Sequence, residues 1–573
     1  MNLPTIVTRS PRYFLPEDLK IKSWADVEPF FIQLDERSIA TSKELNQWLS
    51  DLSELDAVLE EEQAWRYIKM CLNTRDKKAA ASFNFFVEKI EPEIAPFQNR
   101  FDKRLVSFEF PELTEDKALS IVRSKAENAI RTFRKENIQL HAKLQAKAQE
   151  FGAIASEMIV EFEGRSFTLQ QAAIMLKDVD RSKREKVFRL ITDRRLKDQQ
   201  LLNTLFNELI SLRHTVATNA GFDNYRDYKF VEMCRFDYQA KDCFDFHQSI
   251  KEHVVPIINE IDSRRKATLG YDVYRPWDSQ VDLHGKSGLN PFSDSVELID
   301  KTEACFNEID PFFGQCVRTM ANMSHLDLQS REGKAPGGFN YPLYEVGVPF
   351  IYMNAAGSFR DLVTMVHEGG HAIHSFLSRG LRLTAFKDLT SEVAELASMS
   401  MELISMEHWQ VFFPNEDDYK RARREQLEQV IETLPWVAQI DKFQHWIYEN
   451  PQHSISDRED FWDSISNDFS SQIVDWKGLE IARRNLWQKQ LHLFEVPFYY
   501  IEYGMAQLGA IAVWRNYKNN PKKAIDQYKQ ALALGYTAPI DQIYATAGIE
   551  FNFNGDYVKE LMLFVRAELD QLS

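Results

Sequence analysis

The sequence predicts a mostly helical protein, because helical periodicity is widespread and both turn-forming residues and strand-like segments are scarce. Apolar residues recur at helical spacing among Ala, Leu, Glu, Lys and Gln over residues 114–154, 168–218 and most of 389–572. The 573 residues include 21 Gly and 20 Pro, well below the usage of about 7% and 5% in average proteins. We expect an amino-terminal helical lobe over residues 1–200 and a larger lobe over residues 201–573, without a clear linker.

Three segments interrupt the helical pattern. Residues 158–168 alternate apolar and polar side chains around Glu163-Gly164, which predicts a short hairpin. Residues 271–291 contain Pro and Gly and are expected to form a loop on the surface or over a cleft. Residues 334–343 are rich in turn formers and lead into a strand-like stretch, 347–354, directly before the most informative motif of the chain.

Composition excludes several classes of function. The chain has 86 acidic and 69 basic residues, a formal charge of −17, which repels phosphate backbones and anionic lipid, so we expect no nucleic-acid or membrane partner. No apolar run approaches the roughly 18 residues of a membrane span, and the first residues do not match a signal peptide. The five cysteines form no Cys-x-x-Cys pair. A cytoplasmic location is the expectation.

The segment 367–371 reads His-Glu-Gly-Gly-His, which fits the His-Glu-x-x-His pattern. Ser358 is a suitable amino-terminal cap, and Asp361 favours the positive end of a helix dipole, so the flanks predict a helix over about residues 359–379. Within such a helix, His367 and His371 project from the same face one turn apart. Two imidazoles can then reach one ion.

Zinc suits this arrangement, because it accepts nitrogen and oxygen ligands and leaves a position for water when three ligands come from protein. Glu368 points in a different direction from His367 and is suited to accept a proton from that water. The two glycines each cost about 1 kcal/mol in a helix, which indicates that another backbone or a ligand approaches closely. The alternative is a pair of histidines that merely satisfy hydrogen bonds in the core.

A third ligand is expected from a second helical pattern, residues 390–402, which carries Glu392, Glu395 and Glu402 on overlapping faces. Spacing alone does not choose among the three. A solvated acidic face is the alternative explanation for any one of them. Apolar residues crowd the same segment, however, and carboxylates on a buried helix are costly unless a cation compensates them.

Four segments together resemble the thimet oligopeptidase and oligoendopeptidase F family of zinc metallopeptidases, and most of all its Pz-peptidase-like bacterial branch. They are 349–354 (Pro-Phe-Ile-Tyr-Met-Asn), 367–374 (His-Glu-Gly-Gly-His-Ala-Ile-His), 393–398 (Val-Ala-Glu-Leu-Ala-Ser) and 494–509. The resemblance covers about residues 215–550. It implies a zincin-like fold in which two helical lobes enclose a deep substrate channel, with a small β element beside the zinc-binding helix and with residues 201–573 as the catalytic lobe.

The resemblance also implies roles for individual residues. The zinc ligands fall on His367, His371 and Glu395, with one Zn²⁺ per chain, and the general base falls on Glu368. Glu392, one turn before Glu395, would orient a histidine by a hydrogen bond. His374 shares the ligand face, and we expect a packing or supporting role for it.

The family uses a histidine and tyrosines from a carboxy-terminal segment to hold the carbonyl oxygen of the scissile bond. His492, Tyr500 and Tyr503 are the matching residues, with Tyr499 as an alternative to Tyr500. The segment departs from the family pattern, since Val496 stands where thimet-type relatives have a tyrosine. An aromatic core is the alternative explanation for these tyrosines.

The expected activity is metal-assisted hydrolysis of internal bonds in short unstructured peptides, with Glu368 as the base. Gly338 and the strand-like stretch 347–354 are expected to offer an edge along which the substrate backbone pairs. Two alternatives remain at this stage, a zinc carboxypeptidase on a similar helical fold and a non-catalytic peptide-binding protein. The sequence does not fix the oligomeric state and is compatible with a monomer.

Overall fold

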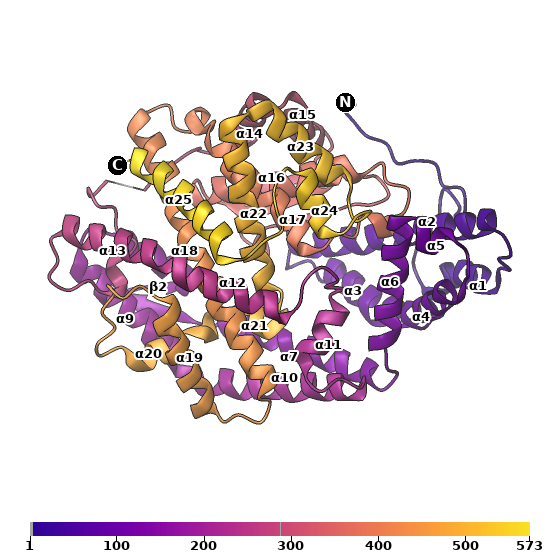
Figure 1. The fold of residues 1–573 in the computed structure, drawn as a ribbon, viewed down its shortest axis with the longest axis horizontal. Coiled ribbons are helices and arrows are strands. Elements are labelled where there is room, and N and C mark those ends of the chain that lie inside the picture. Colours follow the sequence, from indigo (N-terminus) through magenta and orange to yellow (C-terminus); the bar gives the residue numbers. More distant parts are fainter. Residues whose placement is uncertain (1–3, 287, 573) are drawn as a thin grey trace. The chain divides into compact units, whose positions relative to one another are not determined.

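The computed structural model describes residues 4–286 and 288–572. Helices dominate this part of the chain, and its strands form two small sheets, which confirms the predicted mostly helical fold (Figure 1). The chain forms two compact units, each assembled from three separate stretches of sequence. The first unit contains the residues up to Arg131, Leu289–Arg423 and Ala506–Phe551, and the second contains Thr132–Gly288, Arg424–Met505 and the residues from Asn552 onward.

The first unit contains the three-stranded sheet and the helices around it. Its elements are α1 (Glu28–Glu36), α2 (Ser42–Leu72), α3 (Lys77–Phe85), α4 (Glu91–Ser107), α5 (Glu112–Glu115), α6 (Lys117–Thr132), α14 (Ser295–Ile309), α15 (Pro311–Asn322), β3 (Leu326–Gln329), β4 (Phe339–Tyr341), β5 (Phe350–Ala355), α16 (Phe359–Ser378), α17 (Ser391–Met406), α23 (Pro521–Ala533) and α24 (Ile540–Thr546).

The second unit contains a hairpin and a further set of helices. Its elements are α7 (Asn137–Ser156), β1 (Ile159–Phe162), β2 (Arg165–Thr168), α8 (Leu169–Ile174), α9 (Arg181–Lys197), α10 (Gln199–Asn219), α11 (Tyr225–Glu232), α12 (Ala240–His253), α13 (Val255–Leu269), α19 (Ile455–Phe469), α20 (Glu480–Arg484), α21 (Leu491–Glu495) and α25 (Gly555–Gln571). The division between the units falls within α18 (Glu416–Glu449) and α22 (Tyr500–Asn519).

The amino-terminal helices are joined to the sheet of the first unit by a shared apolar cluster. Ala64 and Ile68 of α2 belong to the same buried cluster as Phe350 and Tyr352 of β5. The Tyr352 hydroxyl donates a hydrogen bond of 3.0 Å to the carbonyl oxygen of Cys71 at the end of α2. The long helix α2 therefore supports the sheet directly, although about 280 residues separate them in sequence.

The two units do not coincide with the expected lobes, 1–200 and 201–573, because each unit combines early and late stretches of the chain. Composition along a sequence shows where helices form, but it does not show which distant helices share a core. The division at residue 200 stays a prediction.

The hairpin expected over residues 158–168 is confirmed. Strands β1 and β2 pair antiparallel, with Phe162 opposite Arg165. Glu163 and Gly164 form the turn with φ of 49° and 74°, and two successive positive φ values are what a two-residue hairpin turn with the right twist requires.

The small sheet of the first unit has the order β3-β5-β4, in which β5 pairs parallel to β3 and antiparallel to β4. Both edges of β5 are therefore occupied, and the expectation that the stretch 347–354 offers a free edge to substrate is wrong. The pattern of that stretch predicts a buried strand correctly, but it does not predict how many neighbours the strand has. The strand that follows Gly338 is β4, a terminal strand of this sheet.

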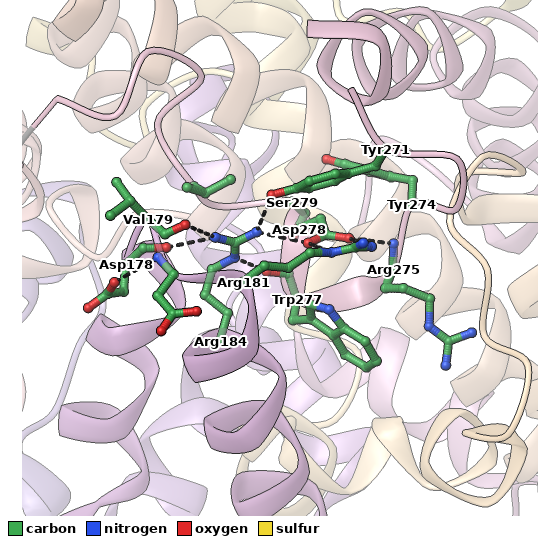
Figure 2. A network of polar contacts seen from close by, with 12 residues as sticks. Asp178, Val179, Arg181, Arg184, Tyr271, Tyr274, Arg275, Trp277, Asp278 and Ser279 are labelled. Carbon is green, nitrogen blue, oxygen red and sulfur yellow. Dashed lines mark hydrogen bonds and ion pairs between the residues drawn. The ribbon is translucent and has the colours of Figure 1, made fainter. Parts of the chain in front are cut away.

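The segment 271–291 is a loop, as predicted, with one short 3₁₀ turn at Pro276–Asp278; residue 287 lies outside the described part. Arg184 of α9 anchors this loop (Figure 2). Its guanidinium pairs with Asp278 at 2.9 Å, and both side chains are fully buried. It also donates to the carbonyl oxygens of Trp277 at 2.9 Å and Asp178 at 2.8 Å. The hydrogen bonds of a buried Arg side chain thus hold this loop, which has little regular secondary structure of its own.

In the described part of the chain, no helix combines the length and the apolar character that crossing a membrane requires. The five cysteines are free thiols, and all except Cys234 are buried.

Replacing Arg184 with Ala should lower the free energy of unfolding by about 1–3 kcal/mol, because the loop loses the buried guanidinium that binds its carboxylate and a carbonyl oxygen, while Arg181 still pairs with Asp278. Guanidinium titration followed by circular dichroism measures this change. The control is Lys241→Ala, which removes an exposed pair with Asp245 in the same unit and should change the midpoint little. Similar midpoints for the two variants would contradict the anchoring role of Arg184.

Candidate active site

Helix α16 begins and ends close to where the sequence predicts. Ser358 caps it, since its Oγ accepts from the backbone N–H of Asp361 at 3.3 Å while the Asp361 carboxylate accepts from the N–H of Ser358 at 2.9 Å. This reciprocal capping fixes the first turn. His367 and His371 then lie on one face, with ring centroids 4.9 Å apart.

The two glycines of the motif lie where α16 touches its neighbours most closely. A Cβ atom on Gly370 would lie 2.6 Å from Ser398 Cα and 2.7 Å from the carbonyl oxygen of Ala397, both in the backbone of α17. A Cβ atom on Gly369 would lie 2.7 Å from the ring of Phe306 on α14. The expected close approach of another backbone is confirmed at Gly370, whereas the close neighbour of Gly369 is a side chain. Helices α16 and α17 lie side by side (Figure 1).

This close approach brings the third expected ligand to the two histidines. Glu395 of α17 has its Oε2 atom 3.4 Å from His367 Nε2 and 3.8 Å from His371 Nε2. One ligand atom from each of the three residues lies within 4.8 Å of the others. Two imidazoles and one carboxylate at this separation suit a single zinc ion.

Two phenols from later helices also hold α17 in place. Tyr528 of α23 donates a hydrogen bond of 2.7 Å to the carbonyl oxygen of Ala397, and Tyr544 of α24 donates one of 3.2 Å to that of Glu392. Both acceptors lie within one turn of Glu395, so two buried phenols hold the backbone that carries the third ligand.

Glu402 of α17 contacts a metal-site histidine. Its Oε1 atom lies 2.7 Å from His367 Nδ1. Since a carboxylate only accepts, Nδ1 carries the proton and Nε2 is left to bind a metal. The orienting role expected for Glu392 stays a prediction. The seven-residue spacing between Glu395 and Glu402 places both carboxylates on one face of α17, which is the signal in the sequence for this role.

Glu368 is 7% exposed. Burial raises its pKa to about 7, with His367 opposing the shift and Glu395 adding to it. The carbonyl oxygen of Glu368 accepts a hydrogen bond of 3.3 Å from the Asn340 side chain. Strand β4, which carries Asn340, therefore lies beside α16, as the predicted fold requires.

Two other candidate residues lie near the metal group without belonging to it. His374 is 1% exposed, and burial lowers its pKa to about 3, so it is neutral at pH 7. Gly338 precedes β4, where a Cβ atom would lie 3.3 Å from the carbonyl oxygen of Tyr352 in β5. Gly338 thus allows close approach of the chain to β5.

The carboxy-terminal candidates form a ring cluster in the second unit. The His492 ring lies 4.7 Å from Tyr500, 5.8 Å from Tyr503 and 6.2 Å from Tyr499, measured between centroids. Tyr499 and Tyr503, one turn apart, lie 5.4 Å from each other. All four side chains are therefore gathered at the start of α22, whereas the metal group belongs to the first unit.

A hydrogen-bond chain fixes the tautomer of His492. The Trp436 indole N–H donates to Gln490 Oε1 at 2.8 Å, and Gln490 Nε2 lies 2.7 Å from His492 Nδ1. An indole only donates, so the Gln490 amide presents its NH₂ to Nδ1. Burial lowers the pKa of His492 to about 4. The neutral ring therefore carries its proton on Nε2, where it is a donor.

Sequence reasoning missed Gln490 and Trp436, because neither belongs to a recognisable motif. The Tyr500 hydroxyl also interacts with these two side chains; burial raises its pKa to about 12, and Gln490 and Trp436 oppose the rise. Tyr500 is therefore part of the support around His492.

Comparison with known proteins gives matches over most of the chain. The model described as Peptidase family M3 matches residues 174–563, and the model described as Peptidase M3 N-terminal domain matches residues 14–133. An oligoendopeptidase F homolog of Borreliella burgdorferi is 26% identical over 60% of this chain and 58% of its own length. The chromosomal oligoendopeptidase F of Lactococcus lactis subsp. cremoris is 23% identical over 57% of this chain and 53% of its own length. The chain thus aligns with little more than half of these relatives.

Solved structures share the fold over nearly the whole chain. A structure described as Pz peptidase A with an inhibitor has 24% identity and a TM-score of 0.88, covering 96% of this chain and 97% of that chain. Oligoendopeptidase F from Enterococcus faecium has 13% identity and a TM-score of 0.64, covering 96% and 97%.

Replacing Gly370 with Ala should destabilise the first unit by about 1–3 kcal/mol, because the added methyl group meets the backbone of α17 and forces the helices apart. Metal affinity should fall with it, since Glu395 moves away from the histidines. The control is Gly380→Ala, just beyond the same helix, where a Cβ atom meets nothing within 4 Å. Thermal unfolding measures the stability, and a chelator competition measures the metal affinity. A Gly370→Ala protein as stable as the wild type would show that α17 does not approach Gly370 closely.

Replacing Glu402 with Ala should weaken metal binding about 10–100-fold, as expected for loss of the group that orients a ligating histidine. Glu402→Gln keeps an acceptor for His367 Nδ1 and should recover part of the affinity. Glu392→Ala serves as the comparison on the same helix, and its affinity should fall less. Zinc-chelator competition measures both affinities. A larger loss of zinc affinity in Glu392→Ala than in Glu402→Ala would assign the orienting role to Glu392.

Proposed function

Because the chain belongs to peptidase family M3, we propose that it is a zinc-dependent oligoendopeptidase that hydrolyses internal bonds of short unstructured peptides. The observation that carries the proposal is the convergence of His367, His371 and Glu395 with Glu368 beside them. A non-catalytic binding protein has no use for a buried carboxylate next to three metal ligands.

In this proposal the three ligands hold the ion and Glu368 moves the proton. A zinc ion held there supplies a Lewis acid and lowers the pKa of water to about 7. Glu368 accepts a proton from the attacking water and delivers it to the leaving amine, a role that its raised pKa of about 7 favours. The Glu402 carboxylate keeps the proton of His367 on Nδ1 throughout.

We assign the stabilisation of the carbonyl oxygen to His492 and Tyr503. The neutral His492 ring offers Nε2–H, and the phenol of Tyr503 offers O–H, so two neutral donors are available for a developing negative charge. Tyr500 supports this pair through Gln490, and Tyr499 packs against Tyr503.

The substrate class follows from the same proposal. Short unstructured peptides are the proposed substrates, in line with relatives named oligoendopeptidase F. The β4 strand after Gly338 is a terminal strand beside the motif helix, and its backbone is suited to pair with an extended peptide. The free thiols and the acidic composition fit a monomeric cytoplasmic enzyme with peptide substrates and no nucleic-acid partner.

Glu368→Gln should lower kcat at least about 10²–10⁴-fold, the contribution of a positioned acid–base group, while zinc content stays unchanged. The assay uses a quenched fluorescent peptide with both ends blocked, and mass spectrometry identifies the products. Internal cleavage by the wild type supports an endopeptidase. Cleavage only of peptides with a free carboxyl terminus would support a carboxypeptidase, and absence of both zinc and cleavage would support a binding protein.

Tyr503→Phe should lower kcat about 10²–10³-fold, as removal of one donor to a developing oxyanion does, and should leave KM nearly unchanged. Tyr517→Phe is the matched control, because it removes a hydroxyl that pairs with His408 in the first unit. Steady-state kinetics on the same blocked peptide give both constants. A change confined to KM would assign Tyr503 to substrate binding alone.

A further inference from the structure

A second group of metal-binding side chains lies in the second unit, on elements that carry none of the proposed peptidase ligands. Cys243 lies on α12, and Asp441 and His445 lie one turn apart on α18. One ligand atom from each of these residues lies within 4.8 Å of the other two. Cys243 and Asp441 are 0% exposed and His445 is 2% exposed, so this is not a surface cluster of acidic residues.

Several atoms of this group that could bind a metal form no hydrogen bond within the described residues. Asp441 Oδ1 and both ring nitrogens of His445 lack a hydrogen-bond partner there, although His445 Nε2 lies 3.2 Å from Asp441 Oδ2. Each buried polar atom left without a partner costs about 1–3 kcal/mol. Even when His445 Nε2 is set aside because of its contact with Asp441, Asp441 Oδ1 and His445 Nδ1 remain, which indicates that something other than the protein's own hydrogen bonds satisfies them.

The surroundings of the group are apolar. The His445 ring contacts Phe244, Phe498 and Phe230, with centroid separations of 4.8, 5.4 and 5.9 Å. A carboxylate in such a position is costly unless a cation compensates it. The rings place the group in an apolar environment, and its atoms are potential ligands of mixed softness.

We propose that Cys243, Asp441 and His445 bind one zinc-class divalent cation, which cross-links α12 to α18. Thiolate, imidazole and carboxylate together are a donor set that zinc accepts, whereas Ca²⁺ and Mg²⁺ require oxygen ligands. Binding releases the thiol proton of Cys243 to solvent, and one thiolate and one carboxylate then neutralise the ion. The second oxygen of Asp441 is available as a further donor.

His247 supports the site from one turn after Cys243 on α12. Its Nε2 atom lies 2.8 Å from Asp441 Oδ2, which holds the carboxylate in position for the ion. Such a hydrogen bond to a ligand is a regular feature of metal centres. Because the ligands are buried, the site serves the structure of the second unit and not the reaction on peptides.

Metal analysis of the purified full-length chain tests the proposal. After dialysis against metal-free buffer, the wild type should retain two zinc ions per chain, and Glu395→Ala should retain one. Adding Cys243→Ser to Glu395→Ala should remove that remaining ion. Cys71→Ser in the same background is the matched control, since Cys71 is a buried free thiol outside both groups, and it should keep the ion.

A measurement on Glu395→Ala alone remains decisive if the double variant fails to fold. Zinc-edge X-ray absorption should show a sulfur scatterer at about 2.3 Å from the metal, because the proposed peptidase site contains no sulfur ligand. A single ion in the wild type, or a spectrum with nitrogen and oxygen scatterers alone, would overturn the proposal and leave a buried His–Asp–His network. Neither result depends on peptidase activity, so failure of this proposal is distinguishable from failure of the proposed function.

Discussion

The contact between the backbones of α16 and α17 at Gly370 is the constraint on which the metal group depends. A helix pair separated by ordinary side chains would hold its backbones too far apart for short carboxylates to reach the histidines. With no side chain at Gly370, Glu395 reaches both His367 and His371, and Glu402 reaches the far nitrogen of His367. The helix-propensity cost of glycine is thus offset by the geometry of the ligands.

The remainder of the first unit preserves that contact. Phenols from α23 and α24 hold the carbonyl groups of α17, and the sheet lies against α16 through Asn340. The α2 helix supports the same sheet from sequence positions far away. The proposed metal ligands and base belong to the first unit, and the proposed neutral donors belong to the second. The helices α18 and α22 each contribute residues to both units.

The sequence was most informative where a function depends on local spacing. The cap at Ser358, the paired histidines, the hairpin at Glu163 and the mainly helical fold are all local patterns, and the family resemblance was confirmed by the match over residues 174–563. The structure differs where a property depends on distant partners. The central position of β5, the contact of Glu402 with His367, and the chain from Trp436 through Gln490 to His492 are properties of packing, which no single segment encodes.

The interleaved composition of the two units has a consequence for biosynthesis. Both units contain residues beyond position 505, so neither core is complete when most of the chain has left the ribosome. The nascent polypeptide lacks the contacts that α23 makes with α16 and that α24 makes with α17 until these late helices emerge. Completion of both units therefore waits for residues after position 505, in contrast to multidomain proteins whose amino-terminal domain folds as a finished unit during synthesis.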